Sequence, residues 1–192
     1  MSMQEEVIFR EAIVEALRKN IADLDVKVEP HKSLWYSLHV SDSGQIEPTG
    51  DKPKRGHDAF EQDIVVFEIK GKRDVPRVVI ETKVYRCSTH VAITYSNKAR
   101  LLKQVYPFLR YILALGGMDR VTPKLIKHGE FFDGIMVLEF DSSKKSIGEK
   151  DLGDFIDFIR REINASRKIG RAREGLLSIK AFLRPVTIIE EL

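Results

Sequence analysis

Apolar residues recur at three- and four-residue steps over residues 1–24, and charged side chains fill the positions between them. This spacing gathers the apolar residues on one face of a helix, so an amphipathic helix is predicted. Residues 26–28 and 34–40 are rich in β-branched and aromatic residues and predict one or two strands. Residues 41–55 contain two glycines and two prolines, which indicates an exposed loop.

The clearest strand signal is a pair of β-branched runs at residues 64–69 and 77–85. The segment between them, Lys-Gly-Lys-Arg-Asp-Val-Pro, is typical of a turn, so an antiparallel hairpin is predicted. Helices and strands alternate through the rest of the chain. We expect a short strand at 91–94, a helix from an N-cap at Ser96 to Gly116-Gly117 with a kink at Pro107, a strand at 132–140, a helix at 151–165 and a strand at 185–189.

This order of elements predicts an α/β fold with a mixed β-sheet flanked by helices. A length of 192 residues favours a single domain, with a core at residues 1–140 and a basic helical and strand extension at 141–192. Hydrophobic residues make up 43% and charged residues 32%, as in soluble globular proteins, and no apolar run approaches the roughly 20 residues of a membrane span. Cys87 is the single cysteine, so no intrachain disulfide can form and a cytoplasmic protein is predicted.

The formal net charge of +3 is unevenly distributed along the chain. Residues 160–184 hold eight Lys or Arg against two Glu, which makes this segment +6 and the rest of the chain −3. Such a segment is typical of a protein that binds a polyanion, and a solvated helix face would show the same pattern. The candidate DNA-binding residues are Arg167, Lys168, Arg171 and Arg173, with a second set, Lys52, Lys54 and Arg55, in the predicted loop.

Two charged residues, Glu81 and Lys83, interrupt the apolar run of the second hairpin strand. A charge buried without a partner costs several kcal/mol, so these side chains must be paired, metal-bound or exposed. A turn centred near Arg73 would place Asp63 opposite Lys83 and Val65 opposite Glu81. Because side chains alternate along a strand, all of these residues then share one face of the sheet. Two carboxylates and an ammonium group are therefore predicted to converge.

Carboxylate oxygens beside a lysine suit phosphoryl chemistry assisted by a divalent metal ion. Asp63, followed after eighteen residues by Glu81-Thr82-Lys83, resembles the D…(D/E)-x-K signature of the PD-(D/E)XK nuclease superfamily. The resemblance covers roughly residues 1–115, although Gln62 stands where the signature has proline. It implies a restriction-endonuclease-like core and a Mg²⁺ ion, or Mn²⁺, bound by Asp63, Glu81 and the Thr82 carbonyl. Lys83 would serve the attacking water.

The same resemblance implies two further site residues. Many relatives add a glutamate from the first helix, for which Glu6 fits best and Glu11 second, and a polar residue from the helix after the motif, here Gln104. The implied activity is that of a Mg²⁺-dependent DNA endonuclease, and relatives that break both strands commonly act as homodimers. The helix at residues 151–165 could supply the dimer contact or simply cover the sheet. The alternative is a catalytically inactive DNA-binding or assembly module with the same fold.

An acid-x-Lys triplet by itself is a weak signal, since the chain contains two others, Asp25-Val26-Lys27 and Glu68-Ile69-Lys70. Asp58 with Glu68 and Lys70 is the fallback constellation. The triplet at residues 81–83 is distinguished by apolar β-branched residues on both sides and by an aspartate at the head of the preceding strand. An exposed edge hairpin with cross-strand ion pairs would also account for it.

Overall fold

The computed structural model describes residues 3–177. The described elements, in chain order, are α1 (Met3–Asn20), the 3-10 helix η1 (Ala22–Leu24), β1 (Val26–Trp35), β2 (His39–Val40), β3 (Ile46–Glu47), β4 (Ala59–Lys70), β5 (Arg73–Val84), α2 (Thr89–Val105), β6 (Arg110–Gly116), α3 (Pro123–His128), β7 (Gly134–Leu138), β8 (Phe140–Asp141), β9 (Ser146–Ile147) and α4 (Glu149–Arg173). The strand predicted at 185–189 lies outside the described residues. Among the described helices, none combines the length and apolar character needed to cross a membrane.

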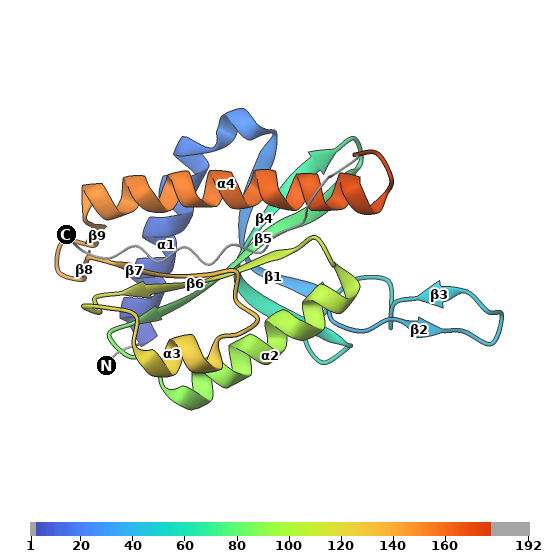
Figure 1. Cartoon of the computed structure of the whole chain (residues 1–192), viewed down its shortest axis with the longest axis horizontal. Coiled ribbons are helices and arrows are strands. Elements are labelled where there is room, and N and C mark those ends of the chain that lie inside the picture. The colour runs from blue at the N-terminus through green and yellow to red at the C-terminus, as the bar shows by residue number, and fades with distance from the viewer. Residues whose placement is uncertain (1–2, 178–192) are drawn as a thin grey trace.

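A five-stranded sheet in the order β1-β4-β5-β6-β7 forms the centre of the fold (Figure 1). β1, β4 and β5 are antiparallel neighbours, whereas β5, β6 and β7 run parallel. α1 and α4 pack on one face through a cluster that includes Phe9, Ile13, Phe155 and Ile159, and α2 packs on the other face. The predicted α/β class with a mixed, helix-flanked sheet is therefore confirmed.

The antiparallel pairing of β4 and β5 is also confirmed, but in a different register. Val65 pairs with Val79 and not with Glu81, because the turn is tighter than expected and Lys70 pairs directly with Arg73. Gly71 makes this two-residue turn possible, since its φ of 61° lies in the left-handed region. From Ile64 to Val66 the predicted register is two residues out, and a shift of two keeps the side chains there on their predicted face. A bulge between Val66 and Phe67 shifts the register by one more residue toward the turn.

The backbone pairing of β4 with β5 stops at Asp63. Their ladder begins at the pair Ile64 and Ile80, whereas the preceding part of β4, from Ala59 to Gln62, is paired with β1. Beyond Ile80, β5 continues along β6. The two strands thus form a fork, and Asp63 and Glu81 lie where its arms separate.

The middle of the chain departs from the prediction. α2 begins at Thr89 with Ser88 as its N-cap, whose Oγ accepts a hydrogen bond from Val91 N at 3.3 Å, so the strand predicted at 91–94 and the N-cap predicted at Ser96 are wrong. The helix ends at Val105, ahead of Pro107, and no kinked helix continues to Gly116. Arg110–Gly116 is instead the interior strand β6, between β5 and β7, because an uninterrupted apolar run between sheet neighbours is buried on both faces.

α4 is longer than predicted and belongs to the core. Its residues Phe155, Ile159 and Ile163 are fully buried in the same cluster as α1, so α4 packs on the sheet as part of the core. The same burial makes these apolar side chains unavailable for the dimer contact considered above. The segment predicted as a loop, residues 41–55, contains part of the small antiparallel ribbon β2–β3.

Truncating Phe155 should test the place of α4 in the core. Phe155→Ala removes a side chain with 0% exposure and should lower the free energy of unfolding by about 3–5 kcal/mol. Urea titration followed by circular dichroism measures this change. The exposed neighbour Asp154 provides a matched control, since Asp154→Ala should change stability by less than about 0.5 kcal/mol. Equal stability of the two variants would show that α4 is not part of the cooperative core.

Candidate active site

Asp63 joins the two arms of the fork. Its Oδ2 accepts hydrogen bonds from Thr82 N at 2.8 Å and from Thr82 Oγ1 at 2.9 Å. The carboxylate thus takes the position that a neighbouring strand would have in a continuous ladder. This contact fixes Asp63 beside the Glu81-Thr82-Lys83 triplet, as the sequence predicted.

Glu81 is 1% exposed and is surrounded by polar groups from three elements. The Tyr111 hydroxyl of β6 lies 2.9 Å from Glu81 Oε1 and 3.1 Å from Oε1 of Gln62. The Lys98 ammonium of α2 lies 3.5 Å from Glu81 Oε1. The Tyr111 hydroxyl and the Lys98 ammonium group therefore both hold the Glu81 carboxyl group in place.

Two neighbouring carboxyl groups create an unfavourable concentration of negative charge. Burial, followed by the charge of Asp63, raises the pKa of Glu81 to about 8, and the opposing effects of Lys98 and Tyr111 do not offset this. A divalent cation between the two carboxylates would remove the repulsion. The charge and the hard oxygen donors therefore suit Mg²⁺ or Mn²⁺.

Lys83 is charged and is aimed by a residue of the first helix. Its Nζ lies 2.7 Å from Glu6 Oε1, and the ring of Tyr95 lies beneath it with a centroid distance of 5.6 Å. Burial lowers the pKa of Lys83, but the hydrogen bond that Lys83 donates to Glu6, together with the charge of Glu6 and the interaction with Tyr95, outweighs this effect, so the pKa lies above its ordinary value. The structure thus brings Glu6 into the site, as expected, whereas Glu11 is exposed.

Four site residues escaped the sequence analysis, and one of them is Tyr111, whose hydroxyl contacts Glu81. Lys98 and Tyr95 lie one turn apart on α2, and Lys98 Nζ is 5.0 Å from the centroid of the Tyr95 ring. Arg10 lies one turn after Glu6 on α1, with its NH1 atom 3.9 Å from Asp63 Oδ1. The spacing of four between Glu6 and Arg10 was visible in the sequence. Tyr95 was hidden because the helix was predicted to start at Ser96. Lys98 lay within the predicted helix, but no sequence pattern connected it to Glu81.

The structure does not bring Gln104 into the site. Gln104 is exposed near the end of α2, six residues after Lys98. Six residues are not a whole number of helical turns, so Gln104 lies on a different face from Lys98. Lys98 is the α2 side chain that contacts Glu81, in the place expected for Gln104.

One of the predicted DNA-binding residues has a structural role. Arg167 Nε lies 2.7 Å from Glu68 Oε1, and its NH2 group donates to the Leu24 carbonyl, so Arg167 ties α4 to β4 and the α1–β1 connection. Arg167 is therefore partnered within the fold, in contrast to the free surface cation expected from the sequence. The other predicted cations are exposed on the surface. They are Lys168, Arg171 and Arg173 on α4, and Lys52, Lys54 and Arg55 between β3 and β4.

The competing acid-x-Lys triplets are used within the fold. Glu68 forms a bidentate contact with Arg77, with distances of 3.0 and 2.6 Å to its Oε2, in addition to the pair with Arg167. Lys27 pairs with Glu29 at 2.9 Å and with Asp74 at 2.6 Å. Asp58 precedes β4 and Glu68 lies near its other end, so the fallback constellation does not assemble.

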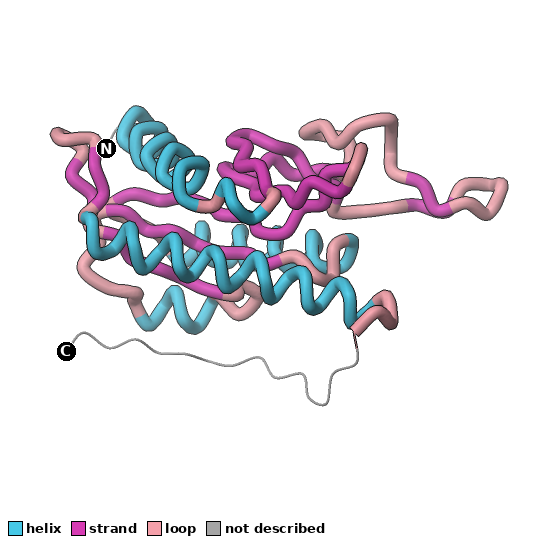
Figure 2. Tube along the Cα trace, turned by 90° about the horizontal axis from the view of Figure 1, so that it is seen from above, coloured by secondary structure: helices cyan, strands magenta, loops and turns pink. Residues whose placement is uncertain are grey.

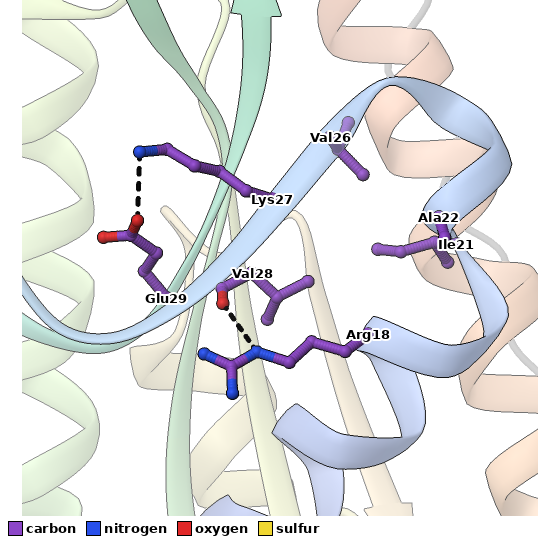
Figure 3. Close-up of a pocket in the computed structure, with 7 residues that line it drawn as sticks. All are labelled: Arg18, Ile21, Ala22, Val26, Lys27, Val28 and Glu29. Carbon is purple, nitrogen blue, oxygen red and sulfur yellow. Dashed lines mark hydrogen bonds and ion pairs between the residues drawn. The ribbon is translucent and has the colours of Figure 1, made fainter.

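A hollow of about 360 Å³ lies elsewhere, between the end of α1 and β1 (Figure 3). Arg18 Nε donates to the Val28 carbonyl at 3.1 Å, and Lys27 pairs with Glu29 beside it. The polar groups that line this hollow bind one another, and it contains none of the residues of the fork.

No family model and no curated protein matches the sequence. The geometry of this chain is therefore what bears on its chemistry. In the part of the chain described, no group of three or more His, Cys, Asp or Glu side chains is placed to hold a metal ion. The fork offers two carboxylates, which suits Mg²⁺, since this ion usually keeps several waters and takes one or two protein carboxylates.

Glu81→Gln should remove a pH dependence of stability. Because the pKa of Glu81 is about 8 in the folded protein and near 4.5 in the unfolded chain, the folded state binds more protons between these values. The free energy of unfolding of the wild type therefore falls as pH rises from 4.5 to 8, by at most about 1.4 kcal/mol per pH unit from this group. In urea titrations without divalent metal, the free energy of unfolding of Glu81→Gln should increase steadily relative to that of the wild type as the pH rises toward 8.

The control for this comparison is Glu130→Gln, since Glu130 is exposed. Its stability should follow that of the wild type at every pH. A constant difference between Glu81→Gln and the wild type over this range would mean that Glu81 ionises at its ordinary pKa.

Proposed function

We propose that the chain is a Mg²⁺-dependent DNA endonuclease with a restriction-endonuclease-like core. The observation that carries this proposal is the carboxylate pair at the fork, Asp63 and Glu81, with Lys83 beside it. The element order supports it too, because a leading helix, an antiparallel pair, the Glu-Thr-Lys strand and a following helix recur in the superfamily that the motif resembles. The parallel strand β6 pairs with β5 along Glu81, Thr82 and Lys83, so the motif lies inside the sheet and not at its edge.

The two carboxylates and the Thr82 carbonyl would hold the metal ion. A divalent ion bound there supplies Lewis-acid polarisation of the phosphate and lowers the pKa of a bound water. Asp63 is fixed for this role by Thr82, and Glu81 by Tyr111. Both ligands are thus oriented before any substrate arrives, which is what such a site requires.

Lys83 would position the attacking water. Its ammonium group is charged and held by Glu6, so it acts through orientation and through stabilisation of developing negative charge, and not as a proton acceptor. Lys98 and Arg10 flank the carboxylates from α2 and α1. They reduce the negative charge of the site and so lessen its repulsion of a phosphodiester.

One such site cuts one strand. Cleavage of both strands of a duplex would then require two copies of the chain, which is the sense in which we propose a homodimer.

The metal-dependent activity is tested with supercoiled plasmid. The wild type should nick it with Mg²⁺ or Mn²⁺ and not with EDTA, and Asp63→Asn, Glu81→Gln and Lys83→Ala should each lower the rate at least about 100-fold. Circular dichroism confirms that each variant is folded. Glu130→Gln and Lys127→Ala, at exposed positions, should cut like the wild type. Wild-type cleavage by Glu81→Gln would refute the assignment, and a folded wild type that binds DNA without cutting would favour the inactive module.

A second comparison separates the two α2 candidates. Lys98→Gln should lower the nicking rate about 10-fold or more, because it removes the cation 3.5 Å from Glu81, whereas Gln104→Ala should leave the rate unchanged. The assay is the same, at saturating metal ion. If Gln104→Ala is the slower enzyme, then the helix contributes to the site through its other face.

A further inference from the structure

The ribbon β2–β3 projects from the body of the molecule, beyond the end of the sheet where β4 begins (Figure 1, Figure 2). His39 pairs with Glu47 and Val40 with Ile46. Its tip is closed by hydrogen bonds from Gly44 N to Ser41 O and from Ser41 N to Gln45 O, both 2.8 Å. This is an ordered two-stranded ribbon in place of a simple loop.

One face of the ribbon is apolar and exposed. Val40 and Ile46 are cross-strand neighbours with exposed fractions of 68% and 73%, and Leu38, which directly precedes β2, is 43% exposed. His39 and Glu47 occupy the other side. Exposed apolar side chains contribute nothing to folding here, and a cluster of them on a projecting element indicates a binding surface.

Cations lie at the base of the same element. Lys52, Lys54 and Arg55 are exposed, and none of them forms an ion pair with another of residues 3–177. The acidic residues of the ribbon are Asp42, Glu47 and Asp51, and Glu47 accepts a hydrogen bond from Ser41 Oγ at 3.3 Å. The ribbon therefore has an apolar projecting part and a cluster of three free cations near its base.

The base of the ribbon is anchored close to the fork. Tyr36 N donates to the Asp58 carbonyl at 2.8 Å, Thr49 Oγ1 donates to Asp58 Oδ2 at 2.5 Å, and the rings of Tyr36 and Phe60 stack with centroids 4.1 Å apart. Asp63 follows Phe60 by three residues on the same strand. A molecule held by the ribbon is thereby held in a fixed relation to the carboxylates.

We infer that the ribbon enters the major groove of double-stranded DNA, where Val40 and Ile46 contact thymine methyl groups while Lys52, Lys54 and Arg55 bind the flanking phosphates. This inference rests on the proposed function and adds to it a substrate, the duplex, and a means of reading its sequence. The dimensions fit, because two strands about 4.8 Å apart enter a groove about 12 Å wide and 8.5 Å deep. The five residue steps from Tyr36 to Ser41, ahead of the turn, reach at most about 17 Å, which exceeds that depth.

A protein partner fits this surface less well. Stable protein interfaces bury about 800 Å² on each side, and the ribbon exposes only three large apolar side chains, Leu38, Val40 and Ile46. The three cations next to it would remain without partners in such a contact, whereas the phosphates that border a groove neutralise them.

The test is duplex binding in EDTA, where cleavage cannot contribute. Fluorescence anisotropy compares labelled duplexes of random sequence that contain thymine with the same pool containing uracil, which lacks the methyl group. The wild type should bind the uracil pool several-fold more weakly, since each buried methyl is worth roughly a factor of 4. The double variant Val40→Thr/Ile46→Thr keeps β-branched side chains in the ribbon and should bind both pools equally.

The matched control is Ile126→Thr, because Ile126 is 68% exposed on α3, away from the ribbon. It should keep the full preference for thymine. A further variant, Lys52→Gln/Lys54→Gln/Arg55→Gln, should keep that preference while flattening the slope of log affinity against log salt by up to about 3.

The outcomes separate this inference from the proposed function. Equal binding of both pools by the wild type overturns the groove contact, whatever the nicking assay shows. Loss of self-association in Val40→Thr/Ile46→Thr, measured by sedimentation, would assign the ribbon to a contact between copies of the chain and overturns it too. A wild type that cuts duplex DNA and discriminates against uracil supports both, and one that binds no DNA overturns both.

Discussion

The fold depends on how one backbone amide is satisfied where two strands separate. A strand that leaves its neighbour exposes N–H and C=O groups whose hydrogen bonds must be replaced. At the fork, the Asp63 carboxylate receives the Thr82 amide, and so a side chain completes a ladder that the backbone no longer continues. A carboxylate in this position is held by the main chain itself, and its neighbour on β5 is necessarily Glu81. The geometry that ends the β4–β5 pairing therefore also places the Asp63 and Glu81 carboxyl groups next to each other.

Two carboxyl groups at a buried position need positive charges close by, and the surrounding helices and strands supply them. Arg10 and Lys98 approach from the helices on opposite faces of the sheet, and the pair of Glu6 with Lys83 is neutral in itself. Three acidic and three basic side chains thus share the site. Because an ion pair removed from water gains little on balance, this arrangement costs stability compared with an apolar core. Clusters of charged residues that lower the stability of a fold are typical of functional sites.

Sequence reasoning succeeded where a pattern with period two was sufficient. It placed Asp63, Glu81 and Lys83 on one face, and the error of two residues in register did no harm because the alternation of side chains was preserved. It failed where the decision depended on tertiary context. The run at 110–116 is apolar enough for a helix or a strand, and its burial between β5 and β7 decides the matter. The predicted helix contained Lys98, but its contact with Glu81 depends on how α2 packs on the sheet, which the sequence pattern does not show. Arg167, likewise, could not be distinguished from a surface cation until its partner Glu68 was known.

The ribbon is inserted between two residues that are already neighbours. Trp35 at the end of β1 and Ala59 at the start of β4 pair directly, so a short turn could close the sheet without residues 36–58. Mutation and selection can therefore lengthen, shorten or rewrite this segment without disturbing the pairing that orients Asp63. Such separation makes the segment between β1 and β4 a structurally independent insertion, whose length and sequence can change while the pairing that positions Asp63 and Glu81 stays the same.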